Sequence, residues 1–200
     1  MKHLLLSFGL LFALGASATA QISTPPLTTP KAADSDRAII RIRQVDMLIQ
    51  ILPLTLRKDQ YGPILTALER ARAKEKQIRS LEDDDLAKIA KKLEDAVNNG
   101  IDKGEYPPKE LQVEAAKLMR AMGIRRQIAT AEMTDEFVEA TKGVFDDGQK
   151  KVMANSLDLV LDQTKKDSMK EEDKVKFFVK RIFLDEVTYD LLLKLQKHAS

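Results

Sequence analysis

Side chains that could perform covalent or acid–base chemistry are scarce in this sequence. Cysteine and tryptophan are absent, and the two histidines are His3 and His198, near the two ends of the chain. A buried histidine base, a thiol nucleophile and a zinc site built from His or Cys are therefore excluded. The G-x-S-x-G, H-E-x-x-H and Gly-rich phosphate-binding motifs do not occur. We expect no enzyme, no catalytic residue and no cofactor.

Two acidic segments could in principle hold a hard cation such as calcium. The first is the run Glu82–Asp85, but consecutive residues of a helix point in different directions, and carboxylates also stabilise a helix N-terminus. The second is the loop from Asn98 to Glu110, which lacks the residue order of an EF-hand. We interpret the first as the start of a helix and the second as a connection between helices, and we expect no metal site.

A basic cluster is the strongest candidate for a binding surface. It occupies ten residues, preceded by Glu69 and interrupted by one acidic residue, Glu75, and its members are Arg70, Arg72, Lys74, Lys76 and Arg79. A helix with this composition covers a core poorly and could present a positive surface with small apolar patches to a protein client. The alternative is a solvated helix with pairs such as Glu75 and Arg79 four residues apart.

The charge balance argues against nucleic acid as a partner. The chain has 33 basic and 31 acidic residues. A nucleic-acid-binding protein normally shows a marked basic excess or a dense basic stripe. We expect protein partners instead.

The N-terminus has the pattern of an export signal. Met1–His3 is followed by the apolar run Leu4–Leu14 and by an A-x-A ending at Ala20. The run is shorter than the roughly 20 residues that a bilayer crossing needs. We therefore predict a signal peptide over 1–20, a periplasmic or secreted protein, and no integral membrane span after cleavage.

For the rest of the chain we predict a flexible Pro/Thr-rich leader over 21–35 and one all-α domain over 36–200. Apolar residues recur at three- and four-residue steps from Asp36 onward, and no run of strand-like alternation occurs. The pattern predicts five to six amphipathic helices in a hairpin- or bundle-like domain. They cover 36–52, about 56–79, about 86–97, 108–144 with a kink or an end at Gly123, a segment from about 146, and a last stretch from about 171.

The central residues of these apolar stripes are the predicted core. The first helix is apolar around more than one stripe, so we expect it to be deeply buried or shared with a partner chain. The predicted core comprises Ile42, Ile49, Leu68, Leu86, Ile89, Leu93, Leu118, Phe137, Leu157, Phe178, Ile182 and Leu191.

Two helix starts carry a related arrangement of residues. Leu54–Gln60 precedes the second helix and Phe145–Gln149 the fifth, and each ends in a glutamine placed to reach back as in a capping box. In the first, either Leu54 and Thr55 or Leu56 and Arg57 stand before the glutamine. The motif and helix-start residues are Leu54, Thr55, Gln60, Phe145, Asp146 and Gln149.

With these two segments the chain resembles the Spy/CpxP-like family of periplasmic proteins, which carry two L-T-x-x-Q motifs in a small all-α fold. Phe145 and Asp146 stand where the family has Leu and Thr. The resemblance implies an ATP-independent periplasmic chaperone or envelope-stress adaptor that holds unfolded clients on a helical surface, and a possible homodimer. The basic second helix is similar in character to the client-binding surface of that family.

A function of another class is also compatible with the sequence. The broad apolar first helix, or the last helix, could serve a structural or scaffolding envelope protein that self-associates or binds one membrane-bound partner. Polar replacement of Ile40 and Met47 is then expected to abolish that binding.

Overall fold

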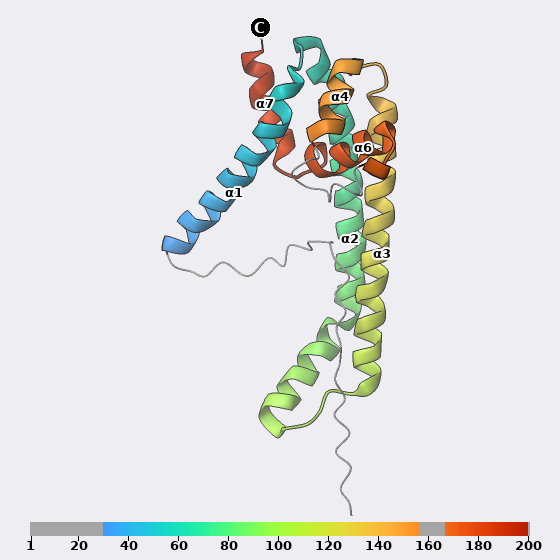
Figure 1. The fold of residues 1–200 in the computed structure, drawn as a ribbon. Coiled ribbons are helices and arrows are strands. Elements are labelled where there is room, and N and C mark those ends of the chain that lie inside the picture. Colours follow the sequence, from blue (N-terminus) through green and yellow to red (C-terminus); the bar gives the residue numbers. More distant parts are fainter. Residues whose placement is uncertain (1–29, 157–166, 200) are drawn as a thin grey trace, which may run out of the picture. The chain divides into compact units, whose positions relative to one another are not determined.

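A computed structural model of the chain describes residues 30–156 and 167–199, and the regular elements in these ranges are all helical (Figure 1). The prediction of an all-α fold is confirmed. The predicted signal peptide, the leader up to residue 29, and Leu157 lie outside the described residues. Within the described ranges, no helix is both long enough and apolar enough to cross a membrane.

Two long helices and several shorter ones make up the described chain. In order they are α1 (Pro30–Ile51), η1 (Leu52–Leu54), α2 (Lys58–Lys103), α3 (Lys109–Ala140), α4 (Asp147–Asn155), α6 (Glu171–Phe178), the π-helical segment η3 (Val179–Phe183) and α7 (Thr188–His198). The chain divides into two units, residues 1–38 and 39–200. Residues 30–38 of the first unit form the N-terminal turns of α1.

The first helix begins at Pro30 rather than at the predicted Asp36. It ends at Ile51, where the short turn η1 with Pro53 follows, as the proline predicts. Ile51 and Leu54 are fully buried and fasten this end of α1 to the core.

The second long helix corrects the sequence interpretation. We predicted one helix ending near Arg79 and another beginning after Glu82–Asp85, but α2 runs through both without a break. No glycine or proline interrupts the segment, and Glu82 and Asp85 find basic partners on α3. The predicted stop at Asn98–Gly100 is also passed, because the helix continues to Lys103 and ends at Gly104 in the left-handed conformation (φ 67°).

The third helix packs along α2 (Figure 1). It follows Pro108, as predicted, and runs unbroken through Gly123 to Ala140. Beyond it, Thr141 donates its hydroxyl to the carbonyl of Phe137 at 2.8 Å, and Gly143 adopts φ 78° in the turn that leads to α4. The antiparallel pair of α2 and α3 is called the hairpin below.

The core lies where α4, α6, η3 and α7 gather at one end of the hairpin. Three rings, Phe137, Phe145 and Phe178, surround Phe183 at centroid distances of 5.2, 5.6 and 5.6 Å. Thr188, fully buried, donates its hydroxyl to the carbonyl of Ile182 at 2.6 Å and so joins α7 to η3. This region, called the Phe core, holds most of the buried apolar side chains.

Half of the predicted core residues are buried as expected. These are Leu68, Ile89, Phe137, Phe178, Ile182 and Leu191. The prediction is wrong for four others, which are exposed: Ile42, Ile49, Leu86 and Leu93. Leu118 is half-buried. The four exposed residues share one cause, since each belongs to an amphipathic stripe that no described element covers.

Candidate functional site

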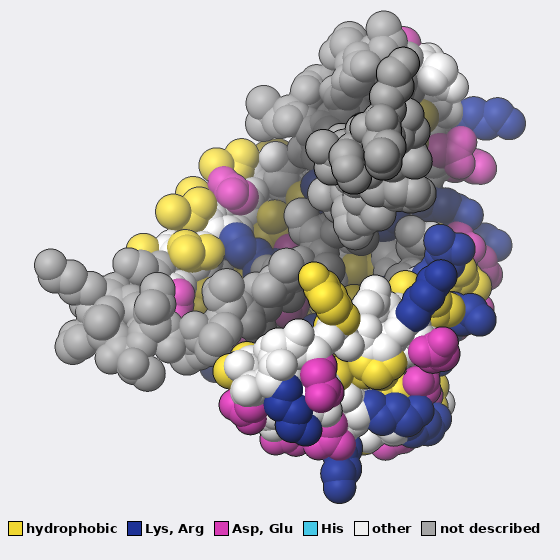
Figure 2. Space-filling model, turned by 90° about the horizontal axis from the view of Figure 1, so that it is seen from below, with side chains coloured by type: hydrophobic (Ala, Val, Ile, Leu, Met, Phe, Trp, Pro, Cys, Tyr) yellow, Lys and Arg dark blue, Asp and Glu magenta, His cyan; other side chains and the backbone are white. Residues whose placement is uncertain are grey.

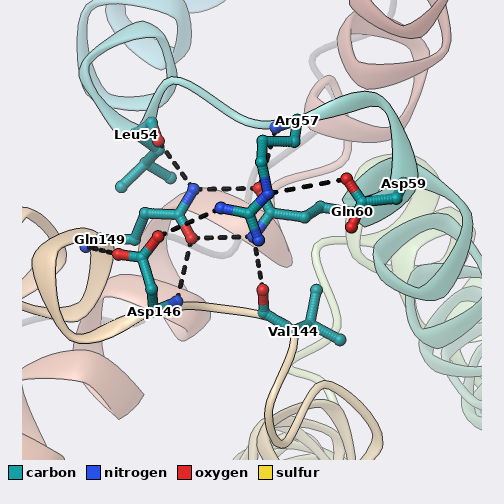
Figure 3. A network of polar contacts seen from close by, with 7 residues as sticks. All are labelled: Leu54, Arg57, Asp59, Gln60, Val144, Asp146 and Gln149. Carbon is teal, nitrogen blue, oxygen red and sulfur yellow. Dashed lines mark hydrogen bonds and ion pairs between the residues drawn. The ribbon is translucent and has the colours of Figure 1, made fainter.

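The two predicted motif segments meet in the structure as two facing helix starts, each closed by a glutamine (Figure 3). Arg57 is the N-cap of α2, and its backbone N–H donates to Oε1 of Gln60 at 2.8 Å. Asp146 is the N-cap of α4, and its backbone N–H donates to Oε1 of Gln149 at 3.1 Å. Each glutamine thereby closes its own helix start.

The two glutamines also bind each other. Gln60 Nε2 donates to Gln149 Oε1 at 2.8 Å, and Gln149 Nε2 donates to Gln60 Oε1 at 3.0 Å. The remaining N–H of Gln60 bonds to the carbonyl of Val144, and that of Gln149 to the carbonyl of Leu54 at 2.9 Å. Both side chains are about 95% buried or more, and both have all four of their hydrogen-bonding positions filled. We call this reciprocal arrangement the glutamine clasp.

An ion pair closes the solvent side of the clasp. Arg57 Nη1 lies 3.2 Å from Asp146 Oδ2, and Arg57 Nε lies 3.6 Å from Asp59 Oδ1. Asp146 Oδ1 accepts the backbone N–H of Gln149 at 2.9 Å. This backbone hydrogen bond, followed by the bond from Arg57, lowers the pKa of Asp146 below its usual range.

The clasp decides between the two readings of the first motif. Leu56 and Arg57 take the positions before Gln60 that Phe145 and Asp146 take before Gln149. Leu54 still contributes through its buried side chain and its carbonyl, but Thr55 is exposed, left-handed (φ 45°) and outside the network. Of the two alternatives for the first motif, the arrangement around Gln60 matches the one with Leu56 and Arg57.

The predicted basic cluster does not form a single surface. Lys74 turns toward α3, where its Nζ lies 2.8 Å from both Glu132 and Glu136, and the pKa of Lys74 is raised by the bonds to these carboxylates. Arg70 lies on the same side of α2, beside a small hollow against α3. Arg72, Lys76 and Arg79 lie on another side and line a groove. The helical period separates residues at these spacings.

The groove has a volume of about 480 Å³ and runs between α2 and the turn from η3 to α7. Its apolar lining includes Leu68 and Phe183. At its rim Arg72 stacks over the ring of Tyr189 at 4.5 Å, and Arg79 bonds Glu75 at 2.6 Å. Tyr189 donates its hydroxyl to Glu69 at 2.7 Å, and this bond raises its pKa.

Among the described residues, Lys76 and Arg70 have no acidic side chain at ion-pair distance. Lys76 is therefore the cation of the groove that stays available to a ligand. Arg70 is its counterpart on the far side of the helix, which makes it a matched control.

The acidic run Glu82–Asp85 provides ion pairs between α2 and α3. Glu82 is 98% buried, and Arg126 binds it through three hydrogen bonds of 2.6 to 2.9 Å. Asp85 binds Lys88 at 2.7 Å and Arg125 at 2.9 Å, and these bonds lower its pKa. Within the described ranges, no three His, Cys, Asp or Glu side chains gather as a metal site would need.

The hairpin around and beyond this ion-pair cluster exposes many large apolar side chains, among them Leu86 and Leu93, which were predicted to be core. On α2 they are Leu81, Leu86, Leu93, Val97 and Ile101, and on α3 they are Val113, Met119, Ile124 and Ile128. Figure 2 shows hydrophobic side chains interspersed with basic and acidic ones at this end of the molecule. The signal that could have found them is the density of apolar positions, which exceeds what one facing helix can cover.

One row along α2 joins the groove to the exposed apolar residues. Arg72, Arg79, Leu86 and Leu93 follow each other at intervals of seven residues. Such positions lie on nearly the same side of a helix, with a drift of about 20° per step. The row therefore begins at the groove and continues as an exposed apolar strip.

Comparison of the chain with family models, with curated proteins and with solved structures finds no match.

Proposed function

We propose that the protein is a non-enzymatic binding protein that holds unfolded protein clients on its helical hairpin. In the cell it would act as an exported, ATP-independent chaperone or envelope-stress adaptor in the periplasm. The observation that carries the proposal is the row from Arg72 to Leu93, which begins at a groove lined by both basic and acidic side chains and continues as an exposed apolar strip. Large exposed apolar surfaces on a soluble protein are characteristic of interaction sites.

The chemistry of the row fits unfolded segments. Leu86 and Leu93 offer apolar contacts that need no defined sequence, and Lys76 offers a charge that attracts the acidic residues of a client. The two glutamine-closed helix starts resemble the two motifs of Spy/CpxP-like proteins, and this resemblance supports the same function.

Suppression of aggregation tests the proposal directly. An unrelated denatured protein is diluted into buffer with the native protein at near-stoichiometric ratio, and light scattering is followed. We expect suppression by the native protein and loss of most of it in L86D/L93D, because carboxylates at the strip make burial of a client unfavourable. The control is I124D/I128D, a more exposed apolar pair on α3 away from the row, with 51 and 54% exposure against 37 and 36% for Leu86 and Leu93.

The contribution of the Lys76 charge to client binding is tested with a second pair of variants, K76E and R70E. K76E is expected to weaken suppression of acidic clients, whereas R70E, a reversal of the same size on the other side of α2, leaves it unchanged. Absence of any suppression by the native protein would end the chaperone proposal.

A second candidate function is favoured by α1. This helix exposes apolar residues along one face, which suits a scaffolding envelope protein that self-associates or binds one membrane-bound partner. Ile40 and Met47, which the sequence singled out for this role, do not share that face: Met47 packs against the core, and Ile40 lies near the same side as Met47.

A further inference from the structure

The exposed face of α1 is a row of four branched apolar side chains. Ile42, Val45, Ile49 and Leu52 are 61, 54, 56 and 56% exposed. They follow each other at steps of three, four and three residues, and Leu52 is the first residue of η1. Figure 2 shows hydrophobic side chains along this helix. None of the residues that the structure describes covers the row.

The row cannot turn onto the protein's own core without breaking contacts. Ile51 is 99% buried and Met47 packs against the core, and a step of 100° per residue places both on the side of α1 opposite the row. Arg43 fixes this orientation, since its guanidinium lies 2.8 Å from Asp185 and 2.9 Å from Glu186. Within 30–156 and 167–199, the row is therefore left open to a further apolar surface.

The spacing specifies what kind of helix fits. In heptad notation Ile42 and Ile49 take position a, and Val45 and Leu52 take position d. In a parallel coiled coil, β-branched residues at a together with Leu at d favour two strands over three or four. The side of α1 that packs on the core then corresponds to the outer positions of the heptad, so core packing and pairing do not compete.

The charged residues beside the row favour the parallel orientation of two α1 helices. Arg41 takes position g and Asp46 position e. In a parallel pair in register, g of one helix lies beside e of the other helix five residues further on, which brings Arg41 of each copy to Asp46 of the other. In an antiparallel pair, g positions face g and e positions face e, which removes this complementarity. Both side chains are exposed, and Arg41 holds only a local bond to Gln44 at 2.7 Å.

We propose that two copies of this chain associate through α1 as a short parallel coiled coil. Ile42, Val45, Ile49 and Leu52 form its seam, and Arg41 pairs with Asp46 across it. The proposal rests on the second candidate function, self-association, and it is independent of client binding. The seam spans about 15 Å, so the dimer is weak and its population depends on concentration.

Sedimentation equilibrium of the protein as recovered from cells tests the association. We expect twice the chain mass at high concentration and a shift to the monomer on dilution. I42D/I49D is expected to raise the dissociation constant at least about 100-fold, because the seam would bury four carboxylates. The control I40D changes an exposed isoleucine of the same helix outside the seam and leaves the mass unchanged. Since these positions are exposed in the monomer, the circular dichroism of each variant is expected to match the parent.

Cysteine cross-linking tests the orientation, because the chain has no cysteine of its own. I42C and I49C are oxidised separately. A parallel pair in register forms a disulfide-linked dimer with both variants, whereas an antiparallel pair can do so with one at most.

Charge reversal gives an independent readout. R41E and D46R are each expected to weaken the dimer, and R41E/D46R to restore it. A monomer at every concentration, a dimer insensitive to I42D/I49D, or cross-linking of only one cysteine variant would overturn the proposal. Suppression of client aggregation, measured by light scattering, does not depend on the dimer, so failure of the dimer proposal and failure of the chaperone proposal can be told apart.

Discussion

The Phe core and the distal hairpin use apolar residues in opposite ways. In the Phe core, Phe183 touches three other rings and is 99% buried. In the hairpin beyond Glu82, Ile89 is buried, but Leu93, Val97 and Ile101 are 36, 58 and 77% exposed. Two helices alone cannot cover the apolar surface that they carry. The comparison indicates that one region supplies stability and the other supplies surface.

The largest difference in the free energy of unfolding is expected between a side-chain truncation in the Phe core and one in the distal hairpin. F183A removes the ring at the centre of the Phe core and should lower the free energy of unfolding by about 3–5 kcal/mol. I101A, on the exposed end of α2, should change it by less than about 0.5 kcal/mol. Urea unfolding followed by circular dichroism measures both. Similar losses in the two variants would contradict the division of roles.

The ion pairs of the hairpin mark where the second region begins. R126M leaves the buried carboxylate of Glu82 without its main partner and should cost about 2–3 kcal/mol, less than for a fully buried pair because Arg126 is half exposed. K92M breaks the exposed pair with Glu114 and should cost about 0.5 kcal/mol or less.

A double variant sharpens this prediction. E82L/R126M replaces both charged partners by apolar side chains and should recover most of the loss. Failure to recover would show that the pair contributes more than charge compensation to the hairpin.

The glutamine clasp is expected to behave as one unit. Q60A or Q149A leaves the amide of the other glutamine partly unsatisfied, at about 1–3 kcal/mol each. The double variant should lose less than the sum, with a coupling energy of about 1–2 kcal/mol, because its two members share their bonds. Q127A, on the exposed side of α3, is the control. If the losses in the free energy of unfolding were additive, the two helix starts would act separately.

The smallest effect concerns the charge of Asp146. Its folded pKa is lowered, so its carboxylate stabilises the fold at neutral pH, and this stabilisation is lost as the pH falls through the ordinary Asp range to the lowered pKa. Asn also caps helices well, so D146N removes the charge and keeps the cap. The two proteins should differ in melting temperature at neutral pH and converge in acid. If the difference in melting temperature stayed the same at every pH, the effect of D146N would come from the helix cap and not from the charge.

Local chemistry made several elements of the fold predictable. Pro53 ends a helix, Pro108 and Asp146 precede helices, and Glu171 begins one, because each depends on backbone bonds within a few residues. The acidic run Glu82–Asp85 looked like a helix start for the same reason. Its partners, Arg125 and Arg126, lie about 40 residues away, so the sequence near the run could not reveal that it lies inside a helix.

The candidate site shows the same limit. Gln60 and Gln149 could be recognised as capping residues, but not as partners of each other, because 89 residues separate them. The basic cluster was correctly located on α2, yet its spacing alone did not show that Lys74 would be paired with α3 while Lys76 stayed available.

The sequence by itself determined that the described chain is helical, where several helices start, and which glutamines and cations stand out. Tertiary structure decided which apolar faces are covered, since Ile42 and Leu86 lie on stripes as regular as that of Phe137. The physical reason is that periodicity defines a face, whereas burial depends on whether another element has apolar surface to place against it.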